Sequence, residues 1–192
     1  MSEHLPELIA PEPPSVLDEL PGDLMMWVLI VSELLVFGAG LAAFLGARIF
    51  DPEGFAAAQD ALHRTGAGIN TLVLVTSGFF AALGVRMAEA GRKAATRGWL
   101  AAASALGVVF LIVKFVEYAD KARHGIGIET HPFYTFYYLL TGFHAAHVVA
   151  GIVILGLVSI SCVPRTVEVG AAFWHMVDLV WVLLFPVIYL LR

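Results

Sequence analysis

Residues 133–161 read FYTFYYLLTGFHAAHVVAGIVILGLVSIS and contain no Asp, Glu, Lys or Arg. A membrane-spanning helix needs about 20 predominantly apolar residues, and this run exceeds that length. A transmembrane β-strand needs only about ten residues of alternating polarity, whereas the apolar character here is continuous. The stretch therefore predicts one membrane-spanning helix.

Four more runs share this character, and the whole chain has the matching composition. Hydrophobic residues make up 59% and charged residues 14%, with a mean hydropathy of +0.84, whereas soluble domains have about 45–50% and about 25%. The sequence predicts an all-α integral membrane bundle in which residues 23–192 form one transmembrane domain. Its five helices are expected over residues 24–47, 66–90, 99–118, 133–161 and 171–191.

The N-terminal segment, residues 1–22, is acidic and contains several prolines. Six of the first 23 residues are Asp or Glu and none is Lys or Arg, which argues against a nucleic-acid partner and against attachment to anionic lipid. The single cysteine, Cys162, cannot form an internal disulfide, a zinc cluster or an iron–sulfur centre.

Five helices place the two ends of the membrane domain on opposite sides. The basic residues outside the helix interiors divide evenly between the two sides, but the densest group, Arg86 to Arg97, lies on the side of the N-terminus. Because the positive-inside rule gives most weight to basic residues close to the bilayer, we expect a cytoplasmic N-terminus.

Ionisable residues inside the apolar runs cost about 2.5–3.5 kcal/mol each on insertion scales, so each one needs a physical reason. Glu33 has no partner on its own helix and must be protonated or reach a base on another helix, which predicts an intramembrane polar cluster of Glu33, His144 and His147. Residues at i and i+3 share a helix face, which predicts two packing or ion pairs: Lys114 with Glu117, and His175 with Asp178 at the start of the last helix.

Three interpretations of these groups stay open. Hydrogen bonding across helices, which fixes the packing, is favoured. A proton path through the carboxylates and histidines is the second, and a metal or haem site is the third. Di-iron bundles carry Glu-x-x-His on two helices, a motif that this chain lacks. We therefore assign no catalytic residue and no metal ligand, although the candidate ligands would be Glu33, Glu117, His144, His147, His175 and Asp178.

Small and aromatic residues complete the pattern. Glycines and alanines in the first and fourth helices allow close backbone approach. Aromatic residues near the helix ends, Tyr137 and Tyr189 among them, are interpreted as anchors at the membrane interface.

Each of the five helices carries a short motif, and the order of these motifs resembles subunit III of the haem–copper oxidases. The resemblance covers about residues 20–192. The motif positions are Trp27 and Glu33 in the first helix, Asn70 and Ser77 in the second, Lys114, Glu117 and Tyr118 in the third, His144 and His147 in the fourth, and Trp174, His175, Asp178 and Trp181 in the fifth.

Larger members of that family have seven helices, and this chain resembles the last five. The resemblance implies a non-catalytic accessory subunit in a bacterial inner membrane that binds no haem or metal directly. Haem and metal are then expected in a catalytic membrane subunit beside it, and a phospholipid is a further expected ligand. Glu33 matches the intramembrane carboxylate for which the family is known to react with carbodiimide.

Within the family, three stretches resemble the NorE-type proteins that accompany nitric oxide reductase in denitrification: Pro21-Gly22-Asp23, Lys114-Phe115-Val116-Glu117-Tyr118, and the approach to the fourth helix, THPFYTFYY, over residues 130–138. The leading prediction is therefore an accessory subunit that supports assembly, stability or turnover of a nitric oxide reductase. The alternative is subunit III of a respiratory oxygen reductase, a cytochrome c or quinol oxidase. A hypothesis of another class is an independent membrane metalloprotein or transporter that needs no partner.

Overall fold

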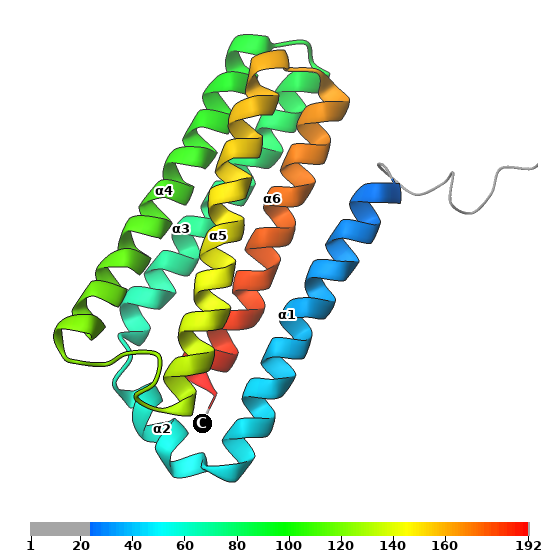
Figure 1. Ribbon diagram of the computed structural model, residues 1–192. Coiled ribbons are helices and arrows are strands. Elements are labelled where there is room, and N and C mark those ends of the chain that lie inside the picture. Colours follow the sequence, from blue (N-terminus) through cyan, green and yellow to red (C-terminus); the bar gives the residue numbers. More distant parts are fainter. Residues whose placement is uncertain (1–23, 192) are drawn as a thin grey trace, which may run out of the picture.

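The computed structural model describes residues 24–191. In that part of the chain the five long helices are each apolar enough to cross a membrane, and no strand is present, which confirms the all-α membrane bundle (Figure 1). The helices are α1 (Leu24–Phe50), α2 (Pro52–Asp60), α3 (Arg64–Glu89), α4 (Lys93–Arg123), α5 (Pro132–Ser161) and α6 (Pro164–Phe185), followed by the π-helix η1 (Pro186–Leu190). The acidic segment 1–22 lies outside the described residues.

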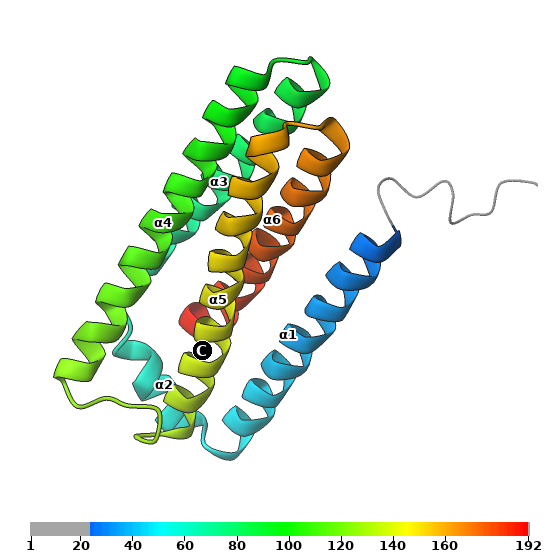
Figure 2. The ribbon, with the colours of Figure 1, turned by 45° about the horizontal axis from the view of Figure 1, so that its top comes forward.

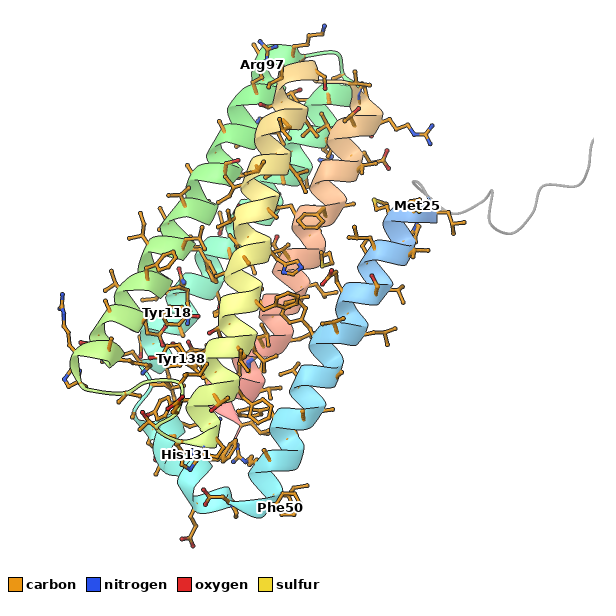
Figure 3. All side chains as sticks on the ribbon, viewed as in Figure 1. Met25, Phe50, Arg97, Tyr118, His131 and Tyr138 are labelled. Atoms are coloured by element: carbon orange, nitrogen blue, oxygen red, sulfur yellow. The ribbon has the colours of Figure 1, made fainter. Side chains whose placement is uncertain are left out.

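Four of the long helices form the body of the molecule and α1 stands beside them. Helices α3, α4, α5 and α6 pack on one another, while α1 packs chiefly on α5 and α6. Its N-terminal end, near Met25, diverges from α6 (Figures 1, 2 and 3). In the most apolar stretch of α1 only 11% of the residues are buried. The corresponding share in the span formed by α6 and η1 is 50%. Most of α1 therefore faces away from the bundle.

The last span begins earlier than its apolar run. We expected it to start at residue 171, but α6 starts at Pro164, because proline fits the first helical position, where its missing N–H is not needed. Arg165 and Glu168 of the first turns are exposed. His175 and Asp178 consequently lie near the middle of the Pro164–Leu190 span rather than at its start.

Helix α2 is a short element that the apolar pattern does not predict. The carboxylate of Asp51 caps it by accepting a hydrogen bond of 3.0 Å from the backbone N–H of Gly54, and Pro52 follows at the first helical position. Phe55 and Gln59 on its inner face are buried. The helix therefore lies against the end of the bundle where the C-terminal residues are found (Figures 1 and 2).

The change from α- to π-helix occurs at Pro186, a residue that cannot donate a backbone hydrogen bond. Carbonyls at a helix end need other donors, and Gln59 supplies one: its side-chain amide donates to the carbonyl of Ile188 at 2.9 Å. Arg48 donates to the side-chain oxygen of Gln59 at 2.9 Å and to the carbonyl of Leu191 at 2.5 Å. These bonds join the end of α1, α2 and η1.

The core of the bundle is organised around Trp174, which is fully buried. A Cβ on Gly107 of α4 or on Gly151 of α5 would lie 2.6 or 2.5 Å from atoms of this indole, so both positions require glycine. The indole N–H donates to the hydroxyl of Ser77 at 3.1 Å, and this hydroxyl donates to the carbonyl of Ala103 at 2.7 Å. One side chain thus connects α3, α4, α5 and α6.

Candidate functional site

Lys114 of α4 is held in a closed site. Its ammonium lies 2.9 Å from a carboxylate oxygen of Glu117 and donates to the hydroxyls of Tyr137 at 3.1 Å and Tyr189 at 2.8 Å. An ammonium has three N–H donors, so all three are used. The Lys114 side chain is 2% exposed. The sequence-predicted pair of Lys114 and Glu117 therefore exists as a buried ion pair.

Aromatic rings surround the same ammonium. The Nζ atom lies between 4.9 and 5.5 Å from the ring centroids of Tyr118, Tyr137, Trp181 and Tyr189, within the distance at which a cation is attracted by a ring face. Tyr137 and Tyr189 are buried, so our expectation that they anchor the protein at the membrane interface is wrong. They bind a charge within the bundle instead.

Further hydroxyl groups extend this site to α3 and α5. Tyr118 donates to the hydroxyl of Thr141 at 2.6 Å, because that hydroxyl itself donates to the carbonyl of Tyr137 at 2.5 Å. The indole N–H of Trp181 donates to Thr71 at 2.9 Å. Sequence reasoning gave Thr71 and Thr141 no part in this site, because a threonine in an apolar run resembles any other packing residue.

Glu33 of α1 lies next to His147 of α5, as the first part of the predicted cluster required. Oε2 of Glu33 is 3.1 Å from Nε2 of His147, at ion-pair distance but without the alignment of a full hydrogen bond. Nδ1 of His147 lies 2.9 Å from the carbonyl of Phe143 and must carry a hydrogen, since a carbonyl only accepts. The contact of Glu33 with His147 joins α1 to α5 inside the apolar layer, where an isolated charge is costly.

His144, the third predicted member of the polar cluster, lies apart from Glu33 and bonds to α6. Its Nε2 is 3.1 Å from the carbonyl of Val177. Its ring packs against Phe110 and Trp181, with centroid distances of 5.5 and 5.0 Å. The imidazole is fully buried and joins α5 to α6.

His175 and Asp178 form a much looser pair. Nδ1 of His175 is 3.8 Å from Oδ2 of Asp178, which is too long for a direct hydrogen bond. Oδ1 of Asp178 is buried and has no hydrogen-bond partner among the described residues. The Asp178 carboxylate rests on the backbone of Gly78, where a Cβ would lie 2.0 Å from Oδ2. The His175 side chain, by contrast, is 48% exposed.

The other motif positions have simpler surroundings. Asn70 is buried and donates to the carbonyl of Phe110 at 3.2 Å, which joins α3 to α4. Trp27 lies in the first turns of α1 and is 36% exposed. Tyr118 lies beside Tyr138 of α5, with a ring-centroid distance of 5.2 Å (Figure 3).

A histidine–carboxylate pair also lies outside the membrane spans, at the end of the bundle that carries α2. His131 caps α5 by accepting the N–H of Phe133 on Nδ1, so its Nε2–H donates to Asp51 at 2.9 Å. This hydrogen bond, together with that from Gly54, lowers the pKa of Asp51 below its usual value. The N-terminal caps of α2 and α5 are thus bonded to each other.

The arrangement joins helices and leaves the candidate metal ligands apart. Within residues 24–191 no three His, Cys, Asp or Glu side chains gather in a way that could hold a metal ion. Lys114 connects α4 to α5 and η1, His144 connects α5 to α6, and Glu33 connects α1 to α5. The fold and its charged groups define a polytopic helical membrane protein whose intramembrane polar side chains connect its helices.

Comparison with known proteins identifies the family. The family profile described as cytochrome c oxidase subunit III matches residues 19–192, and the chain belongs to this family. The chain is 31% identical to the cytochrome c oxidase subunit 3 of Corynebacterium diphtheriae, over 86% of both chains. It is 33% identical to that of Thermostichus vulcanus, over 85% of this chain and 84% of the relative.

A third relative has a different organisation. The heme-copper oxidase subunit I+III of Aeropyrum pernix is 28% identical over 86% of this chain, which corresponds to 22% of that longer protein. These findings confirm the resemblance to subunit III. They support the oxygen-reductase alternative better than the nitric oxide reductase prediction, because all three relatives are named as cytochrome c or heme-copper oxidase subunits.

Proposed function

We propose that this protein is the non-catalytic subunit III of a respiratory oxygen reductase, a cytochrome c or quinol oxidase. It would support the assembly, stability or sustained turnover of a catalytic membrane subunit that holds the haem and metal. The observation that carries the proposal is the family match, which extends through all five membrane spans. The contacts of Lys114, His144 and Glu33 agree with it, since each of these groups connects helices.

The nitric oxide reductase reading is the rival within the same family. It rests on the Lys114-to-Tyr118 run, on the sequence before α1 and on residues 130–138 at the start of α5. In its closed site Lys114 joins helices of the bundle, and this structural role is equally compatible with a subunit of either branch. Lys114 therefore does not favour nitric oxide reductase over oxygen reductase.

For location we propose a bacterial inner membrane with the N-terminus in the cytoplasm. The ends of the described chain lie at opposite ends of the bundle (Figure 1), as an odd number of spans requires. The basic group between Arg86 and Arg97 lies at the end where α1 begins. The positive-inside rule then supports a cytoplasmic location for that end.

A phospholipid is the small-molecule ligand that we propose, in a pocket of about 370 Å³ between the start of α3 and the end of α4. Ala67, Val113 and Val116 supply an apolar wall for an acyl chain. Arg123 and His63 lie at the helix ends, where a phosphate can accept their hydrogen bonds, and the acidic residues Glu117 and Asp120 also line the pocket. Phospholipid retained after detergent purification should fall in Arg123→Gln, but not in the control Arg86→Gln at the other end of α3. Equal retention in both variants would contradict this site.

The central experiment purifies the tagged protein from its native membrane in mild detergent. A haem-containing catalytic subunit should accompany it, and oxygen or nitric oxide consumption by the complex identifies the branch.

Glu33→Gln should keep most of the turnover of the complex, as should the control Glu129→Gln in the exposed connection before α5. Near-complete loss in Glu33→Gln alone would contradict an accessory role and favour an independent proton carrier or metalloprotein.

A further inference from the structure

The exposed surface around His175 combines one polar group with an apolar setting in the middle of a membrane span. The His175 side chain is 48% exposed. On α6, Leu179 and Val182 are 46% and 43% exposed, and on the adjoining α3 Val75 and Phe79 are 47% and 59% exposed. The imidazole is thus surrounded by side chains suited to a hydrocarbon layer or to another apolar helix.

Lipid cannot satisfy an imidazole at this depth. Acyl chains neither donate nor accept hydrogen bonds, and an unsatisfied polar group in the hydrocarbon layer costs several kcal/mol. His175 makes no hydrogen bond with the described residues 24–191, and its ring nitrogen Nδ1 stays 3.8 Å from Oδ2 of Asp178. Its imidazole therefore needs a polar group from another membrane-spanning segment.

The other two histidines of the membrane spans each contact polar groups of this chain, although Nδ1 of the buried His144 has no hydrogen-bond partner among the described residues. His144 bonds to the carbonyl of Val177, and His147 bonds to the carbonyl of Phe143 while facing Glu33. Both lie between helices of the same chain. His175 differs because it lies on the outside of α6, at the side that adjoins α3.

We propose that the surface formed by Val75 and Phe79 of α3 with His175 and Leu179 of α6 docks against a membrane-spanning helix of the catalytic subunit. That helix is apolar and brings one hydrogen-bonding side chain, such as that of Ser, Thr, Asn or Tyr, to the outer nitrogen of His175. This inference rests on the proposed function, which supplies the partner, and it adds the face that the partner contacts.

Asp178 is the positioning residue in this arrangement. Its carboxylate is 11% exposed, lies behind His175 and rests on Gly78. From this place it favours the ring orientation in which Nδ1–H points inward and Nε2 points toward the partner. The carboxylate itself is too buried to contact the incoming helix.

Site-specific photo-crosslinking in the whole native complex tests the face. A benzophenone amino acid is placed at Val75 or Leu179, and in matched controls at Ile112 of α4 or Val153 of α5, which are 56% and 55% exposed. We expect crosslinks to the haem-bearing subunit from Val75 and Leu179 and few from the controls. Crosslinks to that subunit from the control positions alone would overturn the inference while leaving the proposed function intact. Crosslinks between two copies of this chain from Val75 and Leu179 would also overturn it.

Substitution of His175 tests the polar contact. His175→Leu should lower the amount of haem-bearing subunit recovered per tagged protein by about threefold, the size expected for one interhelical hydrogen bond in a membrane, and His175→Asn should restore recovery. Equal recovery for His175→Leu and wild type would remove His175 from the interface. If wild type recovers no haem-bearing subunit, the proposed function itself fails.

Discussion

Two pairs of a basic and an acidic residue in this protein have the same spacing and opposite surroundings. Lys114 and Glu117 on α4, and His175 and Asp178 on α6, are both i,i+3 pairs inside a membrane span. The first pair is closed: its atoms are 2.9 Å apart and Tyr137 and Tyr189 complete its hydrogen bonds. The second is open, with a 3.8 Å separation and a histidine that is 48% exposed. Equal spacing therefore does not imply an equal role.

The difference lies in what the neighbouring helices provide. The closed pair faces inward toward tyrosines from α5 and η1, so each charge meets a polar group of the same chain. On its inner side the open pair lies against the backbone of Gly78 of α3, and Oδ1 of Asp178 has no hydrogen-bond partner among the described residues. We infer that the closed pair stabilises the bundle and that the open pair is completed by another subunit.

Breaking the closed pair should have the largest effect. Glu117→Leu leaves a buried ammonium without its counter-charge, a change that costs about 3–5 kcal/mol. Thermal unfolding of the purified protein in detergent should show this loss. The double variant Lys114→Met with Glu117→Leu should recover part of it, because no lone charge is left. A double variant less stable than Glu117→Leu would contradict the explanation.

The contact beneath the open pair predicts the next largest effect. Gly78→Ala places a methyl group against the Asp178 carboxylate, and overpacking of this kind costs about 1–3 kcal/mol. The matched control on the same helix is Gly68→Ala, where the added Cβ would meet Phe185 at an ordinary 3.8 Å. Denaturation of both variants in the same detergent provides the comparison. Equal stability would show that Asp178 moves freely.

The pair of Asp51 and His131 shows how a histidine–carboxylate pair behaves at the end of the bundle, outside the spans. Because the pKa of Asp51 is lowered in the folded protein, its stabilisation is complete above the unfolded value of about 3.9 and is lost as the pH falls through the folded value. The difference in unfolding temperature between wild type and Asp51→Asn should therefore shrink from about pH 6 to about pH 3. A difference independent of pH would exclude this hydrogen-bonded carboxylate as its source.

The smallest effect is expected for His175→Leu in the isolated protein. Its side chain makes no hydrogen bond with the described residues, so its removal should change the free energy of unfolding by no more than about 0.5 kcal/mol. Chemical or thermal unfolding of the isolated subunit measures this change. A loss as large as that for Glu117→Leu would mean that His175 stabilises the fold and would erase the contrast between the two pairs.

Much of the architecture follows from the sequence, because a long apolar run leaves the backbone few alternatives in a membrane. The five spans, the pair of Lys114 with Glu117 and the contact of Glu33 with a histidine were all predictable from spacing and from the cost of an unpaired charge. Helix α2 was not predicted, since nine residues with a charged start resemble any connecting loop. The early start of α6 was also missed. Its first turns contain charged residues, so they lie outside the apolar run from which the span was predicted, although the helix includes them.

The sequence by itself determined that residues 24–191 contain five helices able to span a membrane and that the buried charges need partners, because both depend on the cost of placing polar groups in hydrocarbon. Only the tertiary structure decided which partners they have. Tyr137 and Tyr189 lie 52 positions apart in the chain, yet both contact the ammonium of Lys114. His144, which was predicted to join Glu33, instead contacts the carbonyl of Val177. Such choices depend on how the helices rotate and pack against one another, which no local pattern specifies.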